Sequence, residues 1–264
     1  MDYHDDIVSF LPAMTLATKI AELRKADRAY RKGSPLITDE AYDLLRAEVL
    51  LRAPYHPAVN RDVTALQSLD SRTNLETWMS TLGSGVPLIV QPKIDGCTLA
   101  LRYTDGFLTD AWTHTGRCAM STAKLIDVPR KLKGGGNIEV HGELYSIEEG
   151  QSQKASAKSL NVKANGDGLL FAAFRIAGYG DGEVCMLRDL DTYGFSTPDY
   201  LCCTYGKQIR KLHQMWLEGR LFSAWPTDGI VIKAVDSKLQ RRLGSDGQAP
   251  FWALAMKKKC LNLN

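Results

Sequence analysis

The stretch LIVQPKIDGCTLALRY (88–103) predicts two β-strands joined by a short link. The first strand is apolar up to Val90, and the second alternates apolar with polar side chains, as half-buried strands do. Lys93 stands near the end of the first strand, and Asp95 and Gly96 form the link. A lysine beside a carboxylate can act as a nucleophile if desolvation or neighbouring positive charge lowers its ordinary pKa of about 10.4. The alternative is a surface lysine followed by an Asp-Gly turn.

Composition places the chain among ordinary globular proteins. Of its 264 residues, 44% are hydrophobic and 24% charged, and the formal net charge of +3 provides no global basic field for nucleic acid. The six cysteines include no C-x-x-C pair, which argues against a zinc ribbon and indicates reduced thiols. The N-terminus MDYHDDIVSF is acidic, and no apolar run is long enough to span a membrane. We therefore expect a cytoplasmic protein without a membrane partner.

Helical periodicity dominates the first 70 residues. Apolar positions near one face predict a first helix that ends at position 33: Leu16, Ile20, Leu23 and Tyr30. Thr38 or Asp39 can cap a second helix, EAYDLLRAEVLLR (40–52), which ends before Pro54. A third helix, NLETWMSTL (74–82), closes at Gly83.

From position 88 onward the pattern changes to strands. Hairpins are predicted at TDG (104–106) and GGGN (134–137). Further strands are predicted at IEVHGELY (138–145), LLFAAFRI (169–176), GIVIKA (229–234) and FWALAMKK (251–258), with helices at LRDLDTYGF (187–195) and KQIRKLHQMWLEG (207–219). His213, on the apolar face of the last helix, is expected to be a packed core histidine rather than a ligand. The fold class is therefore α+β, with an antiparallel-rich domain after a small helical one.

Several predicted strands carry charged side chains at their middle or end. Glu139 and Glu143 lie four positions apart and so point to the same face of their strand. Asp228 and Lys233 bracket one apolar run, and Lys257 ends another. Because a desolvated charge is costly unless it is paired, these residues suggest an anionic ligand with a divalent metal. The alternative is ordinary solubility charges at strand ends.

Other candidate strings carry less information. GYGDGE (178–183) is similar to a glycine-rich phosphate loop, but we expect a turn because no amphipathic helix is predicted directly after it. Basic clusters could contact phosphates: KKK (257–259), RRL (241–243) and the group Arg130, Lys131 and Lys133. Such clusters are more often solvated faces.

Taken in order, these strings resemble the motifs of the adenylation domain of NAD-dependent DNA ligases, a branch of the covalent nucleotidyltransferases. KIDG (93–96) matches K-x-D-G, EVHGE (139–143) resembles E-V-R-G-E, FAAF (171–174) resembles F-F-A-Y, DGIVIK (228–233) matches D-G-V-V-I-K, and FWALAMK (251–257) resembles R-W-A-I-A-Y-K. PLITDEAYDLL (35–45) resembles a motif of the helical domain found only in the NAD-dependent branch. The resemblance implies a helical domain over residues 1–70 and an antiparallel-sheet, ATP-grasp-like nucleotidyltransferase domain over residues 71–264.

The resemblance also implies the chemistry. Lys93 would attack the adenylyl phosphorus of NAD and form a lysyl-AMP, releasing nicotinamide mononucleotide; the AMP would then pass to the 5′-phosphate of nicked double-stranded DNA. Lys233 and Lys257 would hold the phosphate. Asp95 and Glu143 would lie near the ribose or a magnesium ion. The remaining implied contacts are Phe174 stacked on adenine, and Asp39, Tyr42 and Asp43 on the nicotinamide mononucleotide half.

Some positions depart from the family pattern. Gln91 replaces the usual glutamate before the lysine, and its carbonyl can still accept a hydrogen bond from the adenine amino group. THTGR (113–117) replaces T-R-G-D-G and puts His114 or Arg117 in the place of the arginine. Ala29 and Tyr30 replace a Tyr-His pair that contacts the nicotinamide half. The segment KASAKSLNVKANGDG (154–168) is also altered.

Within these 264 residues we expect none of the OB-fold, zinc and helix-hairpin-helix modules of the family. We therefore expect either an adenylation unit alone or one subunit of a split ligase whose partner supplies the DNA-binding modules. Two other functions stay open. One is an ATP-dependent nucleotidyltransferase, such as an RNA ligase or capping-like enzyme; the other is a degenerate domain that only binds nucleotide or a partner protein.

Overall fold

The structure is a computed structural model that describes residues 3–31, 34–56, 58–59, 66, 69–71, 73–146, 168–246 and 249–258. Contacts divide the chain into two compact units. The N-terminal unit comprises Met1–Ala65 and Trp112–Cys118, and the sheet unit comprises Leu66–Ala111 and Ala119–Asn264. Among the described residues, no helix is both long and apolar enough to cross a membrane.

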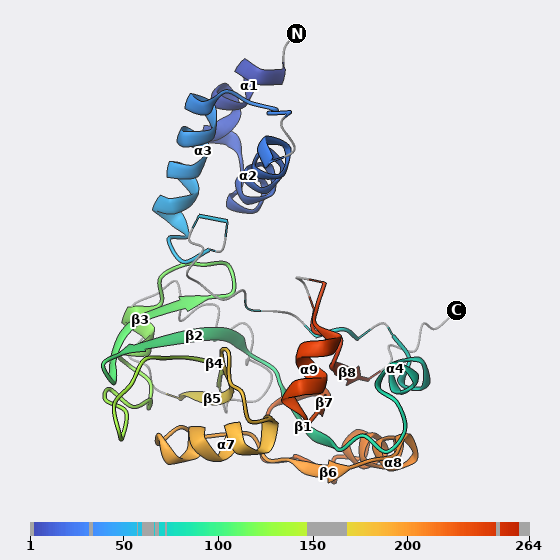
Figure 1. Cartoon of the computed structure of the whole chain (residues 1–264). Helices are drawn as coiled ribbons and strands as arrows, with labels where there is room; N and C mark the ends of the chain where they lie inside the picture. The colour runs from blue at the N-terminus through green and yellow to red at the C-terminus, as the bar shows by residue number, and fades with distance from the viewer. Residues whose placement is uncertain are drawn as a thin grey trace. The chain divides into compact units, whose positions relative to one another are not determined.

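Helices make up most of the N-terminal unit (Figure 1). They are α1 (Tyr3–Phe10), a short 3-10 turn (Leu11–Ala13), α2 (Leu16–Arg31) and α3 (Asp39–Arg52). Thr38 caps α3, since its hydroxyl accepts a hydrogen bond of 3.2 Å from the Ala41 amide. The core contains Leu23, Leu45 and Val49, all fully buried. The prediction of a helix capped at Thr38 or Asp39 is thus confirmed for Thr38.

Tyr30 fits the apolar spacing of α2, but its side chain is 65% exposed. It lies in the last turn of α2, one turn beyond Ala26, where the helix runs past the core that covers Leu23. The buried stripe contains Lys19 instead, which is fully buried because Glu48 on α3 pairs with its ammonium at 2.7 Å.

The described strands of the sheet unit form two four-stranded sheets, one in the order β6-β1-β7-β8 and the other in the order β3-β2-β4-β5. Their bounds are β1 Leu88–Ile94, β2 Cys97–Thr104, β3 Phe107–Thr113, β4 Ile138–Ser146, β5 Leu169–Ile176, β6 Leu201–Cys203, β7 Thr227–Ala234 and β8 Ala253–Lys257. The pairs β1–β6, β1–β7, β7–β8, β2–β4 and β4–β5 are antiparallel. The α+β class with antiparallel sheets, predicted from the sequence, is confirmed.

The link Asp95-Gly96 joins strands of different sheets, because β1 belongs to the first sheet and β2 to the second. One face of β1, with Leu88 and Val90, packs in a cluster with residues of α4 (Leu75–Leu82) and α8 (Gly206–Leu217). Ile89, on the other face, packs in the core of the second sheet. The chain therefore passes from one sheet to the other immediately after Lys93.

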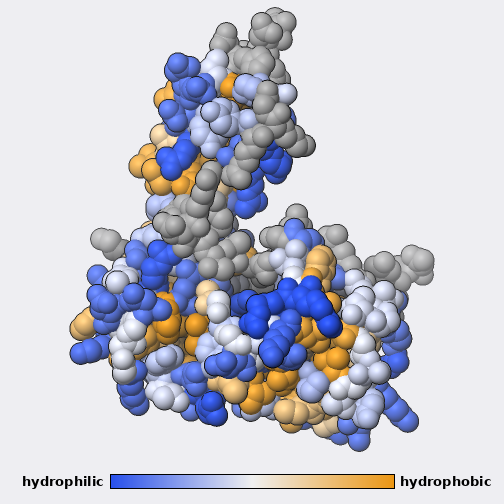
Figure 2. Space-filling model, in the orientation of Figure 1, coloured by the Kyte–Doolittle hydropathy of each residue, from blue (hydrophilic) through white to orange (hydrophobic). Residues whose placement is uncertain are grey.

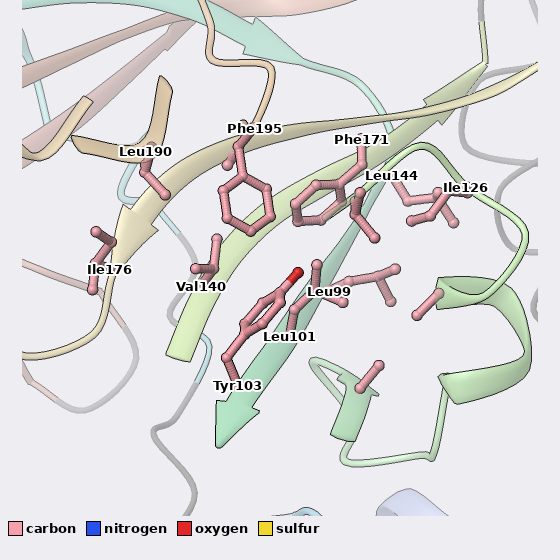
Figure 3. Packing of buried hydrophobic residues seen from close by; sticks show 14 of the residues in the cluster. Leu99, Leu101, Tyr103, Ile126, Val140, Leu144, Phe171, Ile176, Leu190 and Phe195 are labelled. Carbon is pink, nitrogen blue, oxygen red and sulfur yellow. The ribbon is translucent and has the colours of Figure 1, made fainter. Parts of the chain in front are cut away.

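The core of the second sheet joins alternate residues of β2, β4 and β5 with helix α7 (Glu183–Thr192) and the segment after it (Figure 3). Tyr103 lies edge-on to Phe195, with ring centroids 5.8 Å apart, and donates a hydrogen bond of 2.8 Å to the Pro129 carbonyl. The remaining helices are α5 (Met120–Ala123) and α9 (Ser237–Leu243). The sequence pattern predicted neither of these, nor the short strand β6.

Two predicted turns differ from the structure. The TDG hairpin is confirmed, since Asp105 and Gly106 have φ of 51° and 82° between β2 and β3. The GGGN hairpin is wrong: no described strand pairs with β4 across it, and Gly136 instead accepts a hydrogen bond of 2.7 Å from the Gly106 amide. The expectation that no helix follows GYGDGE directly is also wrong, because α7 begins at Glu183.

Candidate active site

Two lysines from different strands meet at one carboxylate. Lys93 Nζ lies 2.9 Å from Asp228 Oδ1, and Lys257 Nζ lies 2.7 Å from Asp228 Oδ2. The strand register brings them together, because Gly229 on β7 is opposite Lys93 of β1 on one side and Lys257 of β8 on the other. In this structure the anion between the two ammonium groups is the carboxylate of Asp228.

The carboxylate between the two lysines stays ionised. Burial raises the pKa of Asp228, but the ammonium groups of Lys257 and Lys93 outweigh burial, and its pKa lies below the ordinary value. The three side chains are only partly exposed, at 22% for Lys93, 26% for Asp228 and 45% for Lys257. Asp228 is thus a charged clamp for both lysines.

A second carboxylate, Glu143 on β4, has a pKa that is raised rather than lowered. Burial raises its pKa to about 7, although the hydroxyl of Thr98 and the charge of Lys93 act against burial. Thr98 Oγ1 donates a hydrogen bond of 3.0 Å to Glu143 Oε2 across the β2–β4 pair. The charges of Asp95 and Asp228 add to the rise. Near neutral pH, Glu143 therefore exchanges between its neutral and charged forms.

The cysteine within this cluster is not a competing nucleophile. Burial raises the pKa of Cys97 to about 11, and the carboxylates of Glu143 and Asp95 add to the effect. At neutral pH the thiol is protonated and Lys93 is the nucleophile candidate of the group. The same effect shows that Asp95 and Glu143 lie close enough to act on one neighbour.

Two motif glycines allow the close backbone approach that this cluster needs. A Cβ at Gly96 would collide with the Leu144 carbonyl, and a Cβ at Gly229 would lie 2.5 Å from the Met256 carbonyl oxygen. No side chain fits at either position without moving a strand of the sheet. Gly96 and Gly229 therefore serve packing, beside Lys93 and Asp228 that carry charge.

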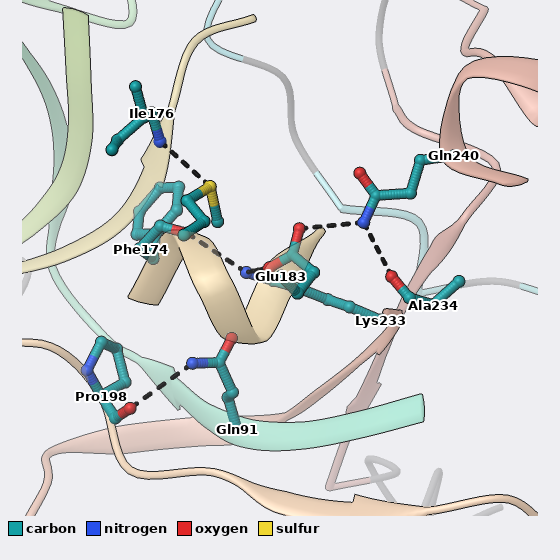
Figure 4. Close-up of polar contacts among 9 residues, drawn as sticks. Gln91, Phe174, Ile176, Glu183, Pro198, Lys233, Ala234 and Gln240 are labelled. Carbon is teal, nitrogen blue, oxygen red and sulfur yellow. Dashed lines mark hydrogen bonds and ion pairs between the residues drawn. The ribbon is translucent and has the colours of Figure 1, made fainter. Parts of the chain in front are cut away.

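Lys233 lies in a different part of the same sheet face. It is opposite Ile89 and Ala253, four residues along β7 from Gly229, which corresponds to about 13 Å of strand. Its Nζ lies 3.2 Å from Glu183 Oε2 and 3.4 Å from the Phe174 carbonyl oxygen, and 5.7 Å from the centre of the Phe174 ring (Figure 4). The predicted convergence of three lysines is thus found for Lys93 and Lys257, whereas Lys233 lies with Glu183 and Phe174.

Gln91 lies between these two groups on β1. It is opposite Val231, and its side chain is buried. Its amide nitrogen points to Pro198 and donates a long hydrogen bond of 3.5 Å to the carbonyl there (Figure 4). Since residues two apart on a strand share a face, Gln91 lies on the same face as Lys93, as Lys233 does.

The predicted contacts of the N-terminal unit lie on α2 and α3. Asp39, Tyr42 and Asp43 are spaced by three and four positions and so share one face of the first turns of α3. The two aspartates are exposed, and Tyr42 is half-buried against the helical core. Tyr30 lies in the last turn of α2.

His114 and Arg117 are exposed in a tight turn that belongs to the N-terminal unit. The Thr113 amide donates a 3.0 Å hydrogen bond to the Arg117 carbonyl, and Gly116, with φ of 79°, lies against the backbone of His56. Burial lowers the pKa of His56 to about 4, with smaller effects from Arg24 and His114. Most of the altered segment 154–168 lies outside the described residues, as does Lys259 of the KKK cluster.

The sequence pointed to Asp228 only as one of several strand-end charges, and it indicated no site role for Thr98 or Glu183. The contact of Asp228 with both lysines depends on the strand register. Thr98 is an ordinary strand residue until β4 places Glu143 opposite it. Glu183 stands at the end of GYGDGE, where the pattern predicted only a turn.

The fit to a magnesium ion can be tested on the donor set. Within the described part of the chain, no group of three or more His, Cys, Asp or Glu side chains is found that could hold a metal. Asp95 and Glu143 are hard oxygen donors near Lys93, and Mg²⁺ is often bound by one or two carboxylates together with substrate phosphates. The residues therefore fit magnesium that arrives with a nucleotide.

Comparison with known proteins gives a consistent picture. A family described as the NAD-dependent DNA ligase adenylation domain matches residues 61–181 and 169–261. A DNA ligase of Ruegeria sp. (strain TM1040) is 28% identical over 312 residues, covering 92% of this chain and 41% of the relative. A DNA ligase of Lactobacillus johnsonii is 27% identical over 307 residues, covering 90% of this chain and 45% of the relative. The chain therefore spans less than half the length of these curated relatives.

Among solved structures, an archaeal ATP-dependent RNA ligase is similar with a TM-score of 0.52 and 12% sequence identity, covering 74% of this chain and 48% of that chain. A likeness at this identity concerns the fold alone. It places the two antiparallel sheets and their helices among folds of the nucleotidyltransferase type.

Proposed function

The chain belongs to the NAD-dependent DNA ligase adenylation-domain family, and from this premise we propose that Lys93 accepts AMP from NAD as a covalent lysyl-AMP. The observation that carries the proposal is the clamp of Lys93 and Lys257 on Asp228, at 2.9 Å and 2.7 Å. A nucleophile and a second cation held together suit attack on the phosphorus of a phosphate group whose oxygens carry negative charge.

In the proposed step the amine of Lys93 displaces nicotinamide mononucleotide from the adenylyl phosphorus. The neutral amine of Lys93 attacks the adenylyl phosphorus, a nitrogen–phosphorus bond forms, and the phosphorus–oxygen bond to nicotinamide mononucleotide breaks. The leaving group takes the electron pair, and the lysine nitrogen loses a proton to solvent. Lys257 stabilises the charge that develops on the phosphate oxygens, while Asp228 keeps both lysines in place. Magnesium, when bound, would neutralise further phosphate charge, and Asp95 and Glu143 are the residues that would hold it.

Gln91, Phe174 and Lys233 form the base end of the proposed nucleotide site. The Phe174 ring offers a stacking surface, and Lys233 lies 5.7 Å from its centre. A nucleotide that lies along β1 and β7 would meet Lys93 at its phosphate and these residues at its base. This assigns Lys233 to the base rather than to the phosphate.

The two parts of NAD go to two domains in this proposal. Residues 71–264 form the adenylation domain, and residues 1–70 recognise the nicotinamide mononucleotide half through the α3 face of Asp39, Tyr42 and Asp43, with Tyr30 as a further contact. His114 or Arg117 takes the place of the family's arginine as a contact of the cofactor. The AMP is then delivered to the 5′-phosphate of a DNA nick. Further modules, carried by a longer form of the chain or by a second subunit, would help to hold the DNA.

Mass spectrometry tests the proposed adduct directly. The chain is incubated with NAD and magnesium, and we expect one AMP per chain, mapped to Lys93. Lys93→Ala should carry none, whereas Lys207→Ala, at an exposed lysine of α8, should be modified as the wild type is. An adduct that survives in Lys93→Ala, or no adduct on the wild type, would contradict the proposal.

The same assay separates the alternatives. An adduct from ATP but none from NAD would favour an ATP-dependent nucleotidyltransferase. Nucleotide binding without any adduct would favour a degenerate binding domain. A nick-sealing assay with the same preparation then asks whether this chain delivers AMP to DNA by itself.

A further inference from the structure

Glu183, the first residue of α7, is a buried carboxylate that the proposed reaction does not use. It is 3% exposed and its partner Lys233 is 6% exposed, with Nζ and Oε2 3.2 Å apart. Burying two charges costs more than their attraction returns unless both are well placed and further hydrogen-bonded. A buried pair at this position therefore needs a reason beyond stability.

The carboxylate of Glu183 is held from two sides (Figure 4). Gln240 Nε2 on α9 donates a hydrogen bond of 3.0 Å to Glu183 Oε1 and another of 2.7 Å to the Ala234 carbonyl. The Glu183 amide donates to the Val235 carbonyl at 3.0 Å, which ties the start of α7 to the end of β7. One oxygen thus anchors the carboxylate, and the other is directed at Lys233.

Lys233 is in turn oriented toward the Phe174 ring. An ammonium group has three N–H donors, and among the described residues its acceptors are Glu183 Oε2 and the Phe174 carbonyl. One N–H then remains for a ligand beside the Phe174 ring, over which the Lys233 ammonium lies at 5.7 Å from the ring centre. A base stacked on Phe174 would present a ring nitrogen to that donor.

We propose that Glu183, anchored by Gln240, is a positioning residue that directs Lys233 at a ring nitrogen of the bound purine and so favours adenine over hypoxanthine. The inference rests on the proposed nucleotide site but not on the lysyl-AMP step. Adenine N1 is an acceptor for the ammonium, whereas hypoxanthine carries a hydrogen there and offers a donor against a donor. The charge of Glu183 also acts on Arg175, because burial lowers the pKa of Arg175 and the carboxylate opposes that fall.

Equilibrium binding of AMP and inosine monophosphate, measured by calorimetry, tests the inference without any reaction. The wild type should prefer AMP, and Glu183→Gln should weaken AMP binding by roughly ten- to a hundred-fold while inosine monophosphate changes little, since a charge-assisted hydrogen bond is lost only to the first ligand. Glu183→Asp keeps the charge on a shorter chain and should be intermediate. Gln240→Ala, which leaves both charged groups in place, should lower the preference as well.

Glu139→Gln is the matched control. Glu139 is another carboxylate of the sheet unit, in an ion pair with Arg102 at 3.3 Å and 2.8 Å from the ring nitrogen of His141. A general loss of stability would affect Glu139→Gln and Glu183→Gln alike and leave the preference for AMP unchanged. A preference unchanged in folded Glu183→Gln or Gln240→Ala, tighter AMP binding in Glu183→Gln, or no preference in the wild type would each overturn the inference. A different outcome contradicts the proposed function alone: AMP binds more tightly than inosine monophosphate, yet NAD yields no adduct on Lys93.

Discussion

Replacement of Glu143 by glutamine should make the protein more stable than the wild type at alkaline pH while removing a carboxylate of the proposed site. Glu143 has a folded-state pKa of about 7 against an ordinary value of 4.5, mainly because it is buried. Between these two pH values the folded chain keeps the proton and the unfolded chain releases it. The unfolded state then binds fewer protons than the folded state, so the free energy of unfolding falls as pH rises.

The size of the effect follows from the two pKa values. Each pH unit is worth about 1.4 kcal/mol, so the wild type should lose at most about 3 kcal/mol from this group between pH 4.5 and pH 8. Glutamine has nearly the same shape, can keep the contact with Thr98, and does not ionise. Relative to wild type, Glu143→Gln should therefore gain up to about 3 kcal/mol over the same interval.

Urea unfolding followed by circular dichroism at pH 4.5, 6 and 8 measures this difference. Glu76→Gln is the control, because Glu76 is 56% exposed beside Arg210 and should show no such trend relative to wild type. The reasoning is refuted if the difference between Glu143→Gln and wild type is the same at all three pH values. It is refuted equally if the variant loses stability as pH rises.

Three further predictions concern the same site. If Glu143 acts as a carboxylate, the rate of lysyl-AMP formation in the wild type should fall about tenfold per pH unit below pH 7. Glu143→Gln should react slowly, and its rate should show no step near pH 7. Initial rates measured between pH 5.5 and 8.5 test both statements. Lys257→Ala should slow adenylation by about a hundred-fold or more yet change the free energy of unfolding by less than about 1 kcal/mol, because its side chain is 45% exposed; equal effects on rate and stability would contradict this. Gly229→Ala should cost about 1–3 kcal/mol in urea unfolding, since a Cβ there would lie 2.5 Å from the Met256 carbonyl oxygen, whereas Gly180→Ala, with no atom within 4 Å, should cost less.

Local pattern was enough to predict much of the fold. Alternation identified β1, β2, β4, β5, β7 and β8, and helical spacing with capping residues identified α3 and α4. Errors fell where local signals compete. The glycines of GYGDGE favour a turn, although α7 begins at Glu183. The three glycines before β4 favour a hairpin, although no described strand pairs with β4 across them. Tyr30 fits the helical stripe of α2 but lies beyond its core.

By itself, the sequence determined the residues that carry charge at strand ends, the order of the motif strings and the α+β class, because strand and helix periods depend on near neighbours along the chain. Only the tertiary structure decided which of these charges meet. Lys93 and Lys257 reach the same carboxylate because both are paired with Gly229, the neighbour of Asp228 on β7. Lys233 lies four residues further along β7 and therefore pairs with Glu183 instead. The pairing register of β1 and the choice of its neighbouring strands depend on how its two faces are buried. Helices α4 and α8 cover one face and the second sheet covers the other. This packing joins residues far apart in sequence, so near neighbours along the chain do not determine it.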